Sequence, residues 1–424
     1  MYQNEIFASI NTVDSEFLSK KNLISYLQKR ITKSQLNVEV AGISNLENWE
    51  FDSSGMFKHV TGRYFSIQGI KYKNSYSGIL NQPEVGVLSN FMTIHNGIAY
   101  FLIQFKEEPG NINKIQLSPT IQATKSNYSR VHGGSLPQYW NEYTIYCKKN
   151  TLLSYNLPEQ GTRYWRKYNK NEIILTPLLS ESENFKWLTL GQLFALQNFP
   201  NSINSCLRSS LSLIFELTEY SKSSQDKLGN KLNNFSKLKS KNSSKLGKNI
   251  ENFYNPDSDS INISSDFDTF EVIGVNVSSQ SREIITWSQP LVKEKESQQY
   301  FLIYTKIENK IYILWSLDTE PGLVNTSNLG PTLKNISYRN EFNKNLSILP
   351  AFNNIKKFNM SEEGGRFYKF EIEHNICEID FDESLLSNEN FIILDINSSV
   401  DMNNKGLMSM EARSLFFFFI KNCF

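Results

Sequence analysis

The chain has 424 residues, of which 39% are hydrophobic and 13% aromatic, so it is long enough for two to three domains with cores of their own. Its 44 Lys and Arg residues balance 43 Asp and Glu residues, and a net charge of +1 excludes a bulk field that would attract nucleic acid or a membrane surface. The four cysteines lack CxxC spacing and are far apart, which favours neither a zinc site nor a disulfide framework and indicates a reducing, cytoplasmic location.

The N-terminal segment, residues 1–39, is expected to be helical. Residues 12–33 have apolar side chains near helical spacing, which is typical of an amphipathic helix. The first residues lack the basic and apolar regions of a signal peptide, and no apolar stretch approaches the roughly 18 residues of a membrane span. We therefore expect neither secretion nor a membrane partner.

Short anchors recur in the same order in the two halves of the chain, which predicts a tandem duplication. The pairs include Gln82-Pro83 with Gln289-Pro290, and two Glu-Pro-Gly and two Pro-Thr motifs that end or follow β-rich runs. Single residues that pair in this way are Gly69 with Gly274, Arg163 with Arg366, and Arg208 with Arg413. We expect two similar domains, 40–220 and 261–424, joined by a Ser/Asn/Lys-rich linker over 221–260.

Each domain is expected to combine a sheet with packed helices, an α/β (α+β) fold, because strand-length apolar runs alternate with Gly, Pro and Asn punctuation. Helices are predicted over 187–199 and 203–220. The phenylalanine run near the C-terminus, "LFFFFIKNCF", is too short to cross a bilayer and predicts a buried helix end or strand.

A polar alternation over residues 116–132 distinguishes the first half from the second. An extended chain places alternate side chains on one face, and every second residue here is polar: Gln116, Ser118, Thr120, Gln122, Thr124, Ser126, Tyr128, Arg130 and His132. The face of an exposed edge strand is polar too. The length of this run, its Gly133-Gly134 end and its shorter counterpart after Pro331 favour a binding surface.

The segment "EPGNINKIQLSPTIQATKSNYSRVHGG", with "HVTGRYFSIQGI" before it and "EQGTRYWRKYNKN" and "WLTLGQL" after it, resembles the NDP-hexose 2,3-dehydratase family. The resemblance implies a homodimer whose subunits have two Nudix-like domains. It also implies loss of water across C2 and C3 of dTDP-4-keto-6-deoxyglucose without a cofactor, and a 3-ketoreductase that traps the product. The alternative is a sugar-nucleotide-binding protein that has lost catalysis.

The implied reaction needs a base at C3, donors at the enolate oxygen and an acid for the C2 hydroxyl. Of the polar alternation we assign proton transfer to His132 first and Tyr128 second, with Arg130 as an electrostatic clamp. His59 and Arg63 are candidates for the sugar or its diphosphate, and Gly133 for close approach of the backbone. The other polar residues of the run are candidates for substrate binding.

A diphosphate favours arginine, which adds Arg163 and Arg166 to the candidates. Arg163 and Glu159 recur as Arg366 and Glu362, so an architectural ion pair is an equal alternative for them. Tyr164, Trp165 and the amides of Gln116 and Gln122 are candidates for thymine. Because no clustered glutamates of a Nudix metal helix and no glycine-rich nucleotide fingerprint occur, we expect neither a metal nor a nicotinamide cofactor.

Overall fold

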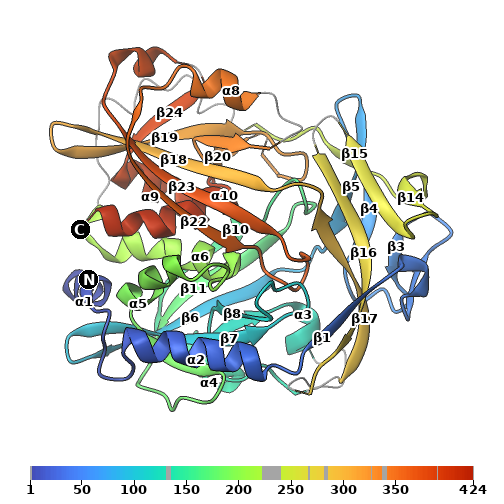
Figure 1. Ribbon diagram of the computed structural model, residues 1–424, viewed down its shortest axis with the longest axis horizontal. Coiled ribbons are helices and arrows are strands. Elements are labelled where there is room, and N and C mark those ends of the chain that lie inside the picture. Colours follow the sequence, from blue (N-terminus) through green and yellow to red (C-terminus); the bar gives the residue numbers. More distant parts are fainter. Residues whose placement is uncertain are drawn as a thin grey trace.

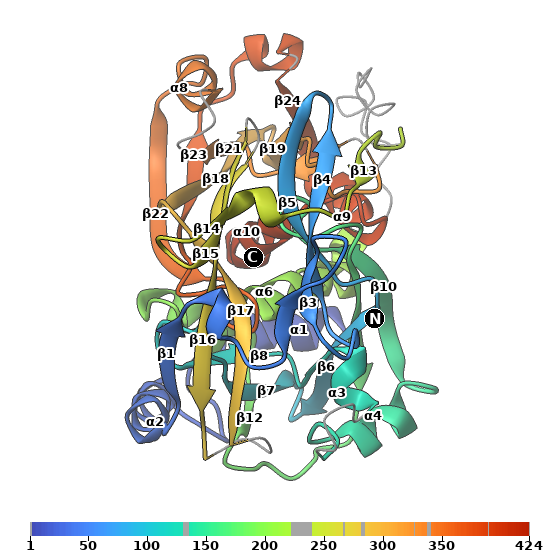
Figure 2. The same cartoon turned by 90° about the vertical axis from the view of Figure 1, so that its right-hand side faces the viewer.

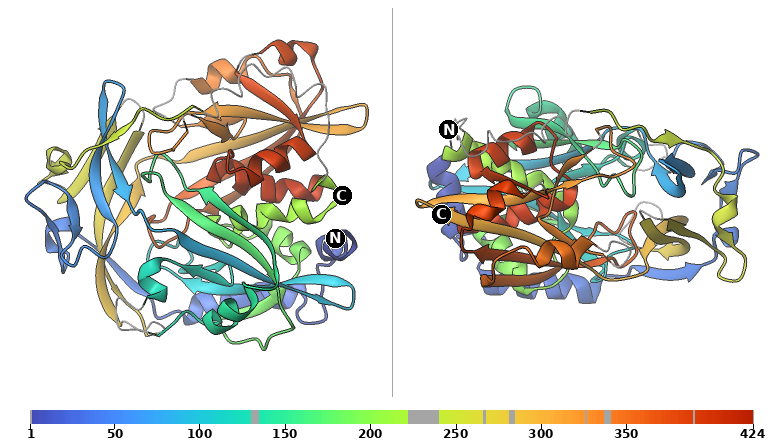
Figure 3. Two further views of the ribbon diagram at one scale, coloured as in Figure 1. Left: turned by 180° about the vertical axis from the view of Figure 1, so that it is seen from behind. Right: turned by 90° about the horizontal axis from the view of Figure 1, so that it is seen from above.

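The computed structural model describes residues 2–129, 135–221, 240–265, 268–280, 285–325, 327–336, 341–388 and 390–423. It is a mixed α+β structure built mostly of strands, as the sequence predicts. Two large sheets face each other with helices between them, and two smaller sheets close one side (Figure 1). Both chain termini lie at the end opposite the small sheets (Figure 3).

The first large sheet has seven strands in the order β10-β11-β6-β7-β12, with β8 paired to β7 and β9 paired to β6. The pair β6–β11 is parallel and the others are antiparallel. The bounds are Gly86–His95 (β6), Ile98–Glu107 (β7), Ile115–Ser118 (β8), Ile121–Ala123 (β9), Thr151–Pro158 (β10), Tyr168–Leu175 (β11) and Phe185–Leu188 (β12).

The second large sheet repeats this order as β22-β23-β18-β19-β24, with β20 paired to β19 and β21 paired to β18. Its parallel pair, β18–β23, occupies the position of β6–β11. The bounds are Gln298–Ile307 (β18), Lys310–Asp318 (β19), Asn328–Gly330 (β20), Leu333–Asn335 (β21), Phe352–Ser361 (β22), Glu371–Ile379 (β23) and Phe391–Asp395 (β24).

In both large sheets the central hairpin splits, and a Pro-Thr motif fills the fork. Thr120 Oγ1 accepts a hydrogen bond from Phe91 N at 2.9 Å and donates to Leu102 O at 2.5 Å. Thr332 makes the same two contacts, with Ile303 N at 2.8 Å and with Leu314 O. Each hydroxyl bonds to a backbone group of both strands where the strands separate. These backbone groups therefore keep hydrogen-bond partners although the two strands do not pair with each other there.

The continuous polar strand expected over 116–132 is therefore wrong. The chain pairs with β7 as β8, crosses the fork at Pro119, and pairs with β6 as β9. It then enters the short helix α3 (Lys125–Tyr128). Asn127 Oδ1 accepts hydrogen bonds from Thr124 N at 3.1 Å and from Thr124 Oγ1 at 2.6 Å, so Thr124 of the alternation belongs to the start of this helix rather than to a shared strand face.

The helices between the large sheets come from the ends of both halves of the chain. From the first half they are α5 (Leu190–Ala195) with the 3₁₀ turn η2 (Leu196–Asn198), and α6 (Ser205–Leu211) with the 3₁₀ turns η3 (Ser212–Leu217) and η4 (Glu219–Ser221). From the second half they are α9 (Ile396–Asn404), and α10 (Met410–Phe419) with η8 (Ile420–Asn422). The predicted helices over 187–199 and 203–220 are thus confirmed in place but are shorter. Residues 187 and 188 instead finish strand β12, which pairs with β7.

Two buried arginines connect α6 and α10 each to the large sheet of the other half of the chain. Arg208 of α6 donates to Ser361 O of the second half at 3.0 Å, and Arg413 of α10 donates to Pro158 O of the first half at 2.6 Å. Their exposed fractions are 0% and 1%. Such donors satisfy backbone carbonyls that the strand ends leave open.

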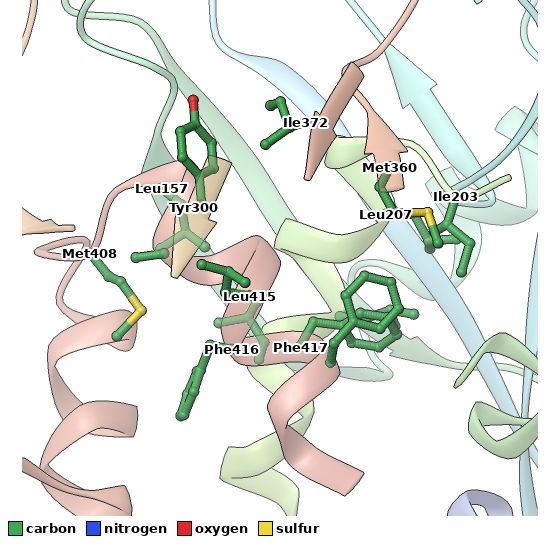
Figure 4. Packing of buried hydrophobic residues seen from close by; sticks show 14 of the residues in the cluster. Leu157, Ile203, Leu207, Tyr300, Met360, Ile372, Met408, Leu415, Phe416 and Phe417 are labelled. Atoms are coloured by element: carbon green, nitrogen blue, oxygen red, sulfur yellow. The ribbon is translucent and has the colours of Figure 1, made fainter. Parts of the chain in front are cut away.

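The core between the large sheets is dominated by α10. Figure 4 shows Phe416 and Phe417 among residues from both halves, including Leu207 of α6 and Met360 of β22. All residues of α10 are buried, so of the two predicted alternatives, a buried helix end or a strand, the phenylalanine run forms the buried helix end.

The small sheets exchange strands between the two halves of the chain. Strand β1 (Asn37–Ala41) pairs with β16 of the second half, and β13 (Lys245–Leu246) pairs with β4 of the first half (Figure 2). The other strands are β2 (Trp49–Phe51), β3 (Phe57–His59), β4 (Ser66–Tyr72), β5 (Ser75–Asn81), β14 (Tyr254–Asn255), β15 (Ser260–Ser265), β16 (Asp268–Ser278) and β17 (Thr286–Glu294). Residues 240–260, assigned to the linker from sequence, thus contribute β13 and β14.

The N-terminal segment forms two helices, α1 (Gln3–Asn11) and α2 (Lys20–Lys33), instead of one over 12–33. The side chain of Ser19 accepts a hydrogen bond from Asn22 N and so starts α2 there. The remaining short elements are α4 (Trp140–Tyr146), α8 (Glu341–Leu346), η1 (Ile43–Asn45), η6 (Glu251–Phe253) and η7 (Glu383–Ser387). Within the described ranges, none of the helices combines the length and apolarity that a bilayer crossing requires.

Candidate active site

A cavity of about 870 Å³ lies against the split edge of the first large sheet. Its walls include the ends of β7 and β9, the small-sheet strands β2 and β3, strand β17, and the loop between β22 and β23. The volume is in the range of pockets that bury a ligand of cofactor size.

The floor of the cavity is a charged network on β7 and β9. Lys106 Nζ lies 2.9 Å from Glu108 Oε1, and Gln122 Nε2 lies 3.3 Å from the same oxygen. Asn204 Nδ2 in turn donates to Gln122 Oε1 at 2.8 Å. The other oxygen of Glu108, Oε2, is buried and has no hydrogen-bond partner. This network fixes Glu108 while leaving one carboxylate oxygen for a ligand.

The loop of the second half, residues 362–370, forms a wall beside this floor. Gly365 N donates to Glu363 Oε2 at 2.7 Å, and Gly365 O accepts from Gln289 Nε2 at 2.9 Å. The guanidinium of Arg366 stacks 4.2 Å from the ring centre of Phe65 and donates to Gly365 O at 2.8 Å. A cation and a carboxyl group thus reach the first-half cavity from the second half.

Aromatic side chains line another wall. The ring of His59 packs edge-on against Trp49 and Tyr64, with ring centres 5.5 Å and 4.5 Å away. His59 Nδ1 lies 2.9 Å from Thr61 Oγ1. Trp287 of β17 also lines the cavity and donates from Nε1 to Gln289 Oε1 at 2.9 Å. These flat faces suit a stacked planar ring.

The inner end of the cavity holds groups whose ionisation is suppressed by burial. Burial raises the pKa of Glu159 and lowers the pKa of Lys167, although their opposite charges partly offset both shifts. Burial also raises the pKa values of the Tyr164 hydroxyl and the Cys206 thiol well above their usual ranges. Asn169 bridges Glu159 to the backbone N of Gly86, so this end is structurally fixed.

The cavity gathers only part of the residues predicted from the sequence. Those that line it are His59, Thr120, Gln122, Thr124, Ser126, Glu159 and Tyr164. Arg130, His132 and Gly133 lie outside the described residues. The remaining candidates, which are not among its lining, are Arg63, Gln116, Ser118, Tyr128, Arg163, Trp165 and Arg166.

The candidates away from the cavity have other contacts. Gln116 is fully buried and donates to Ser361 Oγ at 2.5 Å, and Ser118 donates to Gln104 at 3.2 Å. Tyr128 stacks on Trp140, with ring centres 4.9 Å apart. Arg166 stacks on Trp165, 4.5 Å from its ring.

Arg163 forms a buried ion pair with Glu294 of the second half. Arg163 Nη2 lies 2.6 Å from Glu294 Oε1, and the two side chains are 3% and 5% exposed. This contact favours the architectural alternative for Arg163. Its counterpart Arg366, in contrast, lines the cavity.

Sequence reasoning missed Lys106, Glu108, Glu363 and Arg366 as site residues. Two signals were present: Glu108 belongs to the Glu-Pro-Gly anchor, and Arg366 to the "EEGGRFY" anchor. These four residues meet because the loop over residues 362–370 reaches from the second half into the cavity of the first half. No local sequence pattern indicates this contact.

The corresponding place in the second large sheet is closed by its own side chains. Lys334, which occupies the position of Gln122, lies near Asp318 and 3.4 Å from Glu320 Oε1. The space left there is about 10 Å³, room for about one water molecule. Among the residues that the structure covers, no group of three or more His, Cys, Asp or Glu side chains is arranged to hold a metal ion.

Comparison with known proteins gives a consistent family signal. A family model described as NDP-hexose 2,3-dehydratase matches residues 20–214 and 250–418. Proteins named dTDP-4-dehydro-6-deoxy-alpha-D-glucopyranose 2,3-dehydratase are similar over most of the chain: one from Saccharopolyspora spinosa is 27% identical over 92% of this chain and 89% of its own length. One from Amycolatopsis orientalis is 28% identical, covering 91% and 86%.

A third relative with the same name, from Streptomyces violaceoruber, is 28% identical and covers 91% of this chain and 92% of its own. Among solved structures, that of an ADP compounds hydrolase aligns at 12% identity with a TM-score of 0.25. The alignment covers 36% of this chain and 85% of that one. A likeness this weak carries no argument about the fold.

Proposed function

This chain belongs to the NDP-hexose 2,3-dehydratase family, and we propose that it removes water across C2 and C3 of dTDP-4-keto-6-deoxyglucose in the cavity of the first large sheet. The product is the 2,6-dideoxy-3,4-diketo sugar nucleotide. The substrate is taken from the names of the three relatives and from the resemblance of the sequence segments.

The observation that carries this proposal is the composition of the 870 Å³ cavity, where aromatic rings, cations and carboxyl groups line one space. We assign the thymine ring to the wall of Trp49 and Trp287, because flat aromatic faces stack on a nucleobase. We assign the diphosphate to Arg366 and Lys106, because fixed cations offset its charge. The sugar then lies over the floor formed by Glu108 and Gln122.

The assignment of proton transfer to His132, with Tyr128 and Arg130, stays a prediction from sequence. It is supported by the flanks of that segment, since Ser126 and Asn127 before it and Ser135 and Leu136 after it line the cavity. For Tyr128 the stacking on Trp140 supports a packing role beside the site.

We also propose that the two large sheets belong to tandem Nudix-like domains that arose by duplication. Their identical strand order and the paired Thr120 and Thr332 contacts support this. A homodimer and a coupled 3-ketoreductase complete the proposal and rest on the resemblance, and a cytoplasmic location rests on the cysteine pattern.

The test is to incubate the purified protein with dTDP-4-keto-6-deoxyglucose, a 3-ketoreductase and its reduced nicotinamide cofactor in D₂O. Dehydration places deuterium at C2 when the enol intermediate is protonated from solvent-exchanged groups. Recovery of unlabelled starting sugar, with dTDP binding intact, would instead show a binding protein that has lost catalysis.

A further inference from the structure

Two carboxyl groups from different halves of the chain meet at one point of the cavity, beside Gly365. A Cβ atom placed on Gly365 would lie 2.7 Å from Glu363 Oε2 and 3.2 Å from Glu108 Oε1. Glycine at this position therefore makes the close approach possible. Glu108 and Glu363 both line the cavity.

The surroundings of the two groups differ. Lys106 Nζ lies 2.9 Å from Glu108 Oε1, so an ammonium group contacts that carboxyl group. Burial, and then the negative charge of Glu108, raise the pKa of Glu363, while Arg366 and Lys106 act in the opposite direction. Tyr164 and Cys206 also face Glu363, and both are un-ionised. The two carboxyl groups thus have different surroundings: burial favours the neutral form of Glu363, whereas Glu108 contacts a lysine.

The corresponding position of the second large sheet lacks this arrangement. Glu320 takes the place of Glu108, but Gly161 N donates to its Oε2 at 2.8 Å and Lys334 lies 3.4 Å from its Oε1. The residue in the place of Glu363 is Gln160, because Glu159 and Glu362 close equivalent hairpins. The fold therefore does not require two carboxyl groups here.

An unpartnered carboxylate oxygen in a buried position costs free energy unless a ligand completes it. Glu108 is 5% exposed, and its Oε2 has no hydrogen-bond partner. We propose that Glu108 and Glu363 are catalytic residues: Glu108 is the base at C3 of the sugar, and Glu363 is the acid that releases the C2 hydroxyl. This inference rests on the proposed function, whose substrate it uses.

The proposed steps balance without a cofactor. Glu108 takes the C3 proton, and the electron pair of that C–H bond forms an enolate with the C4 ketone. The C2–O bond then breaks as the C2–C3 double bond forms, and the departing oxygen takes the proton of Glu363 and leaves as water. Finally C2 receives a proton from Glu108 after exchange of that carboxyl proton with solvent, and the C3 enol gives its proton to Glu363. Both carboxyl groups return to their starting states.

The experiment compares Glu363→Gln and Glu108→Gln with Glu383→Gln, a control on the exposed turn η7. Binding of dTDP alone shows whether the pocket is intact. Proton NMR in D₂O follows exchange of the C3 hydrogen, and the coupled assay follows dehydration. We expect Glu363→Gln to lose dehydration by about 10²–10⁴-fold while C3 exchange continues. Glu108→Gln should lose both, and Glu383→Gln neither.

Dehydration by Glu363→Gln within a few-fold of the wild-type rate, or ordinary C3 exchange by Glu108→Gln, would overturn the assignment. If Glu363→Gln fails to bind dTDP, Glu363→Asp replaces it, because it keeps an acid in the pocket. Equal loss of dehydration in the Asp and Gln variants then also overturns the role of an acid. A wild-type protein that binds dTDP but converts no sugar overturns the proposed function itself, which separates the two failures.

Discussion

Replacing Arg163 by methionine should destabilise the protein without removing nucleotide binding. Arg163 donates to Glu294 Oε1 from Nε at 2.8 Å and from Nη2 at 2.6 Å, and its guanidinium lies 4.5 Å from the ring centre of Phe270. With side chains 3% and 5% exposed, the pair is nearly dry. Loss of one partner leaves a buried charge, and breaking such a pair costs about 3–5 kcal/mol.

The matched variant is Arg163→Met combined with Glu294→Met, which removes both charges. Because the desolvation cost of a buried pair offsets much of its attraction, the double variant should recover most of the lost stability. Urea unfolding followed by tryptophan fluorescence gives the free energies of unfolding, and titration with dTDP gives the affinity. A single variant that unfolds like the wild type but no longer binds dTDP would refute the reasoning and return Arg163 to the diphosphate site.

Three further predictions concern catalysis, the sheet fork and pH. His132→Ala tests the assignment of proton transfer made from the sequence: with Glu108 and Glu363 carrying the proton transfers, this variant should keep turnover in the coupled assay, and abolished turnover would return proton transfer to His132. Thr332→Val should lower the free energy of unfolding by about 1–3 kcal/mol, since it leaves Ile303 N and Leu314 O unpaired; an unchanged urea midpoint would contradict this. Burial lowers the pKa of His374 to about 3, so its stabilising contribution is lost as pH falls below the unfolded value. Relative to His374→Gln, the wild type should lose about 2 kcal/mol between pH 6.5 and 5, and a constant difference between the two proteins would count against the reasoning.

The sequence predicted those features that repeat locally. Strand-length apolar runs, the helices after them and the buried phenylalanine run are short-range patterns, and the structure contains each of them. One anchor was misaligned: Leu80 bridges to Tyr164 as Val292 bridges to Phe367, so Gln82 does not correspond to Gln289, which lies within β17. Short motifs such as Gln-Pro recur by chance, whereas the bridges follow the strand register.

The polar alternation misled because periodicity assumes an unbroken strand. Pro119 lies between β8 and β9, and the Thr120 hydroxyl donates to the backbone oxygen of Leu102. The residues before this point therefore pair with β7, and those after it pair with β6. Only part of the candidate site could be predicted from the sequence. Glu108 lies on the first-half sheet, but Glu363 and Arg366 enter from a loop more than two hundred residues later, and such a contact depends on tertiary packing alone.

The pairing of β1 with β16 means that β1 is synthesised long before the strand with which it pairs. Strand β1 leaves the ribosome roughly 230 residues before its partner, which at 5–20 residues per second is a wait on the order of 10–50 s. During that time its edge is unpaired, and an unpaired edge can recruit another chain. A first half released on its own would keep that edge permanently, so the two halves are expected to need each other from synthesis onward and to fail as separately expressed fragments.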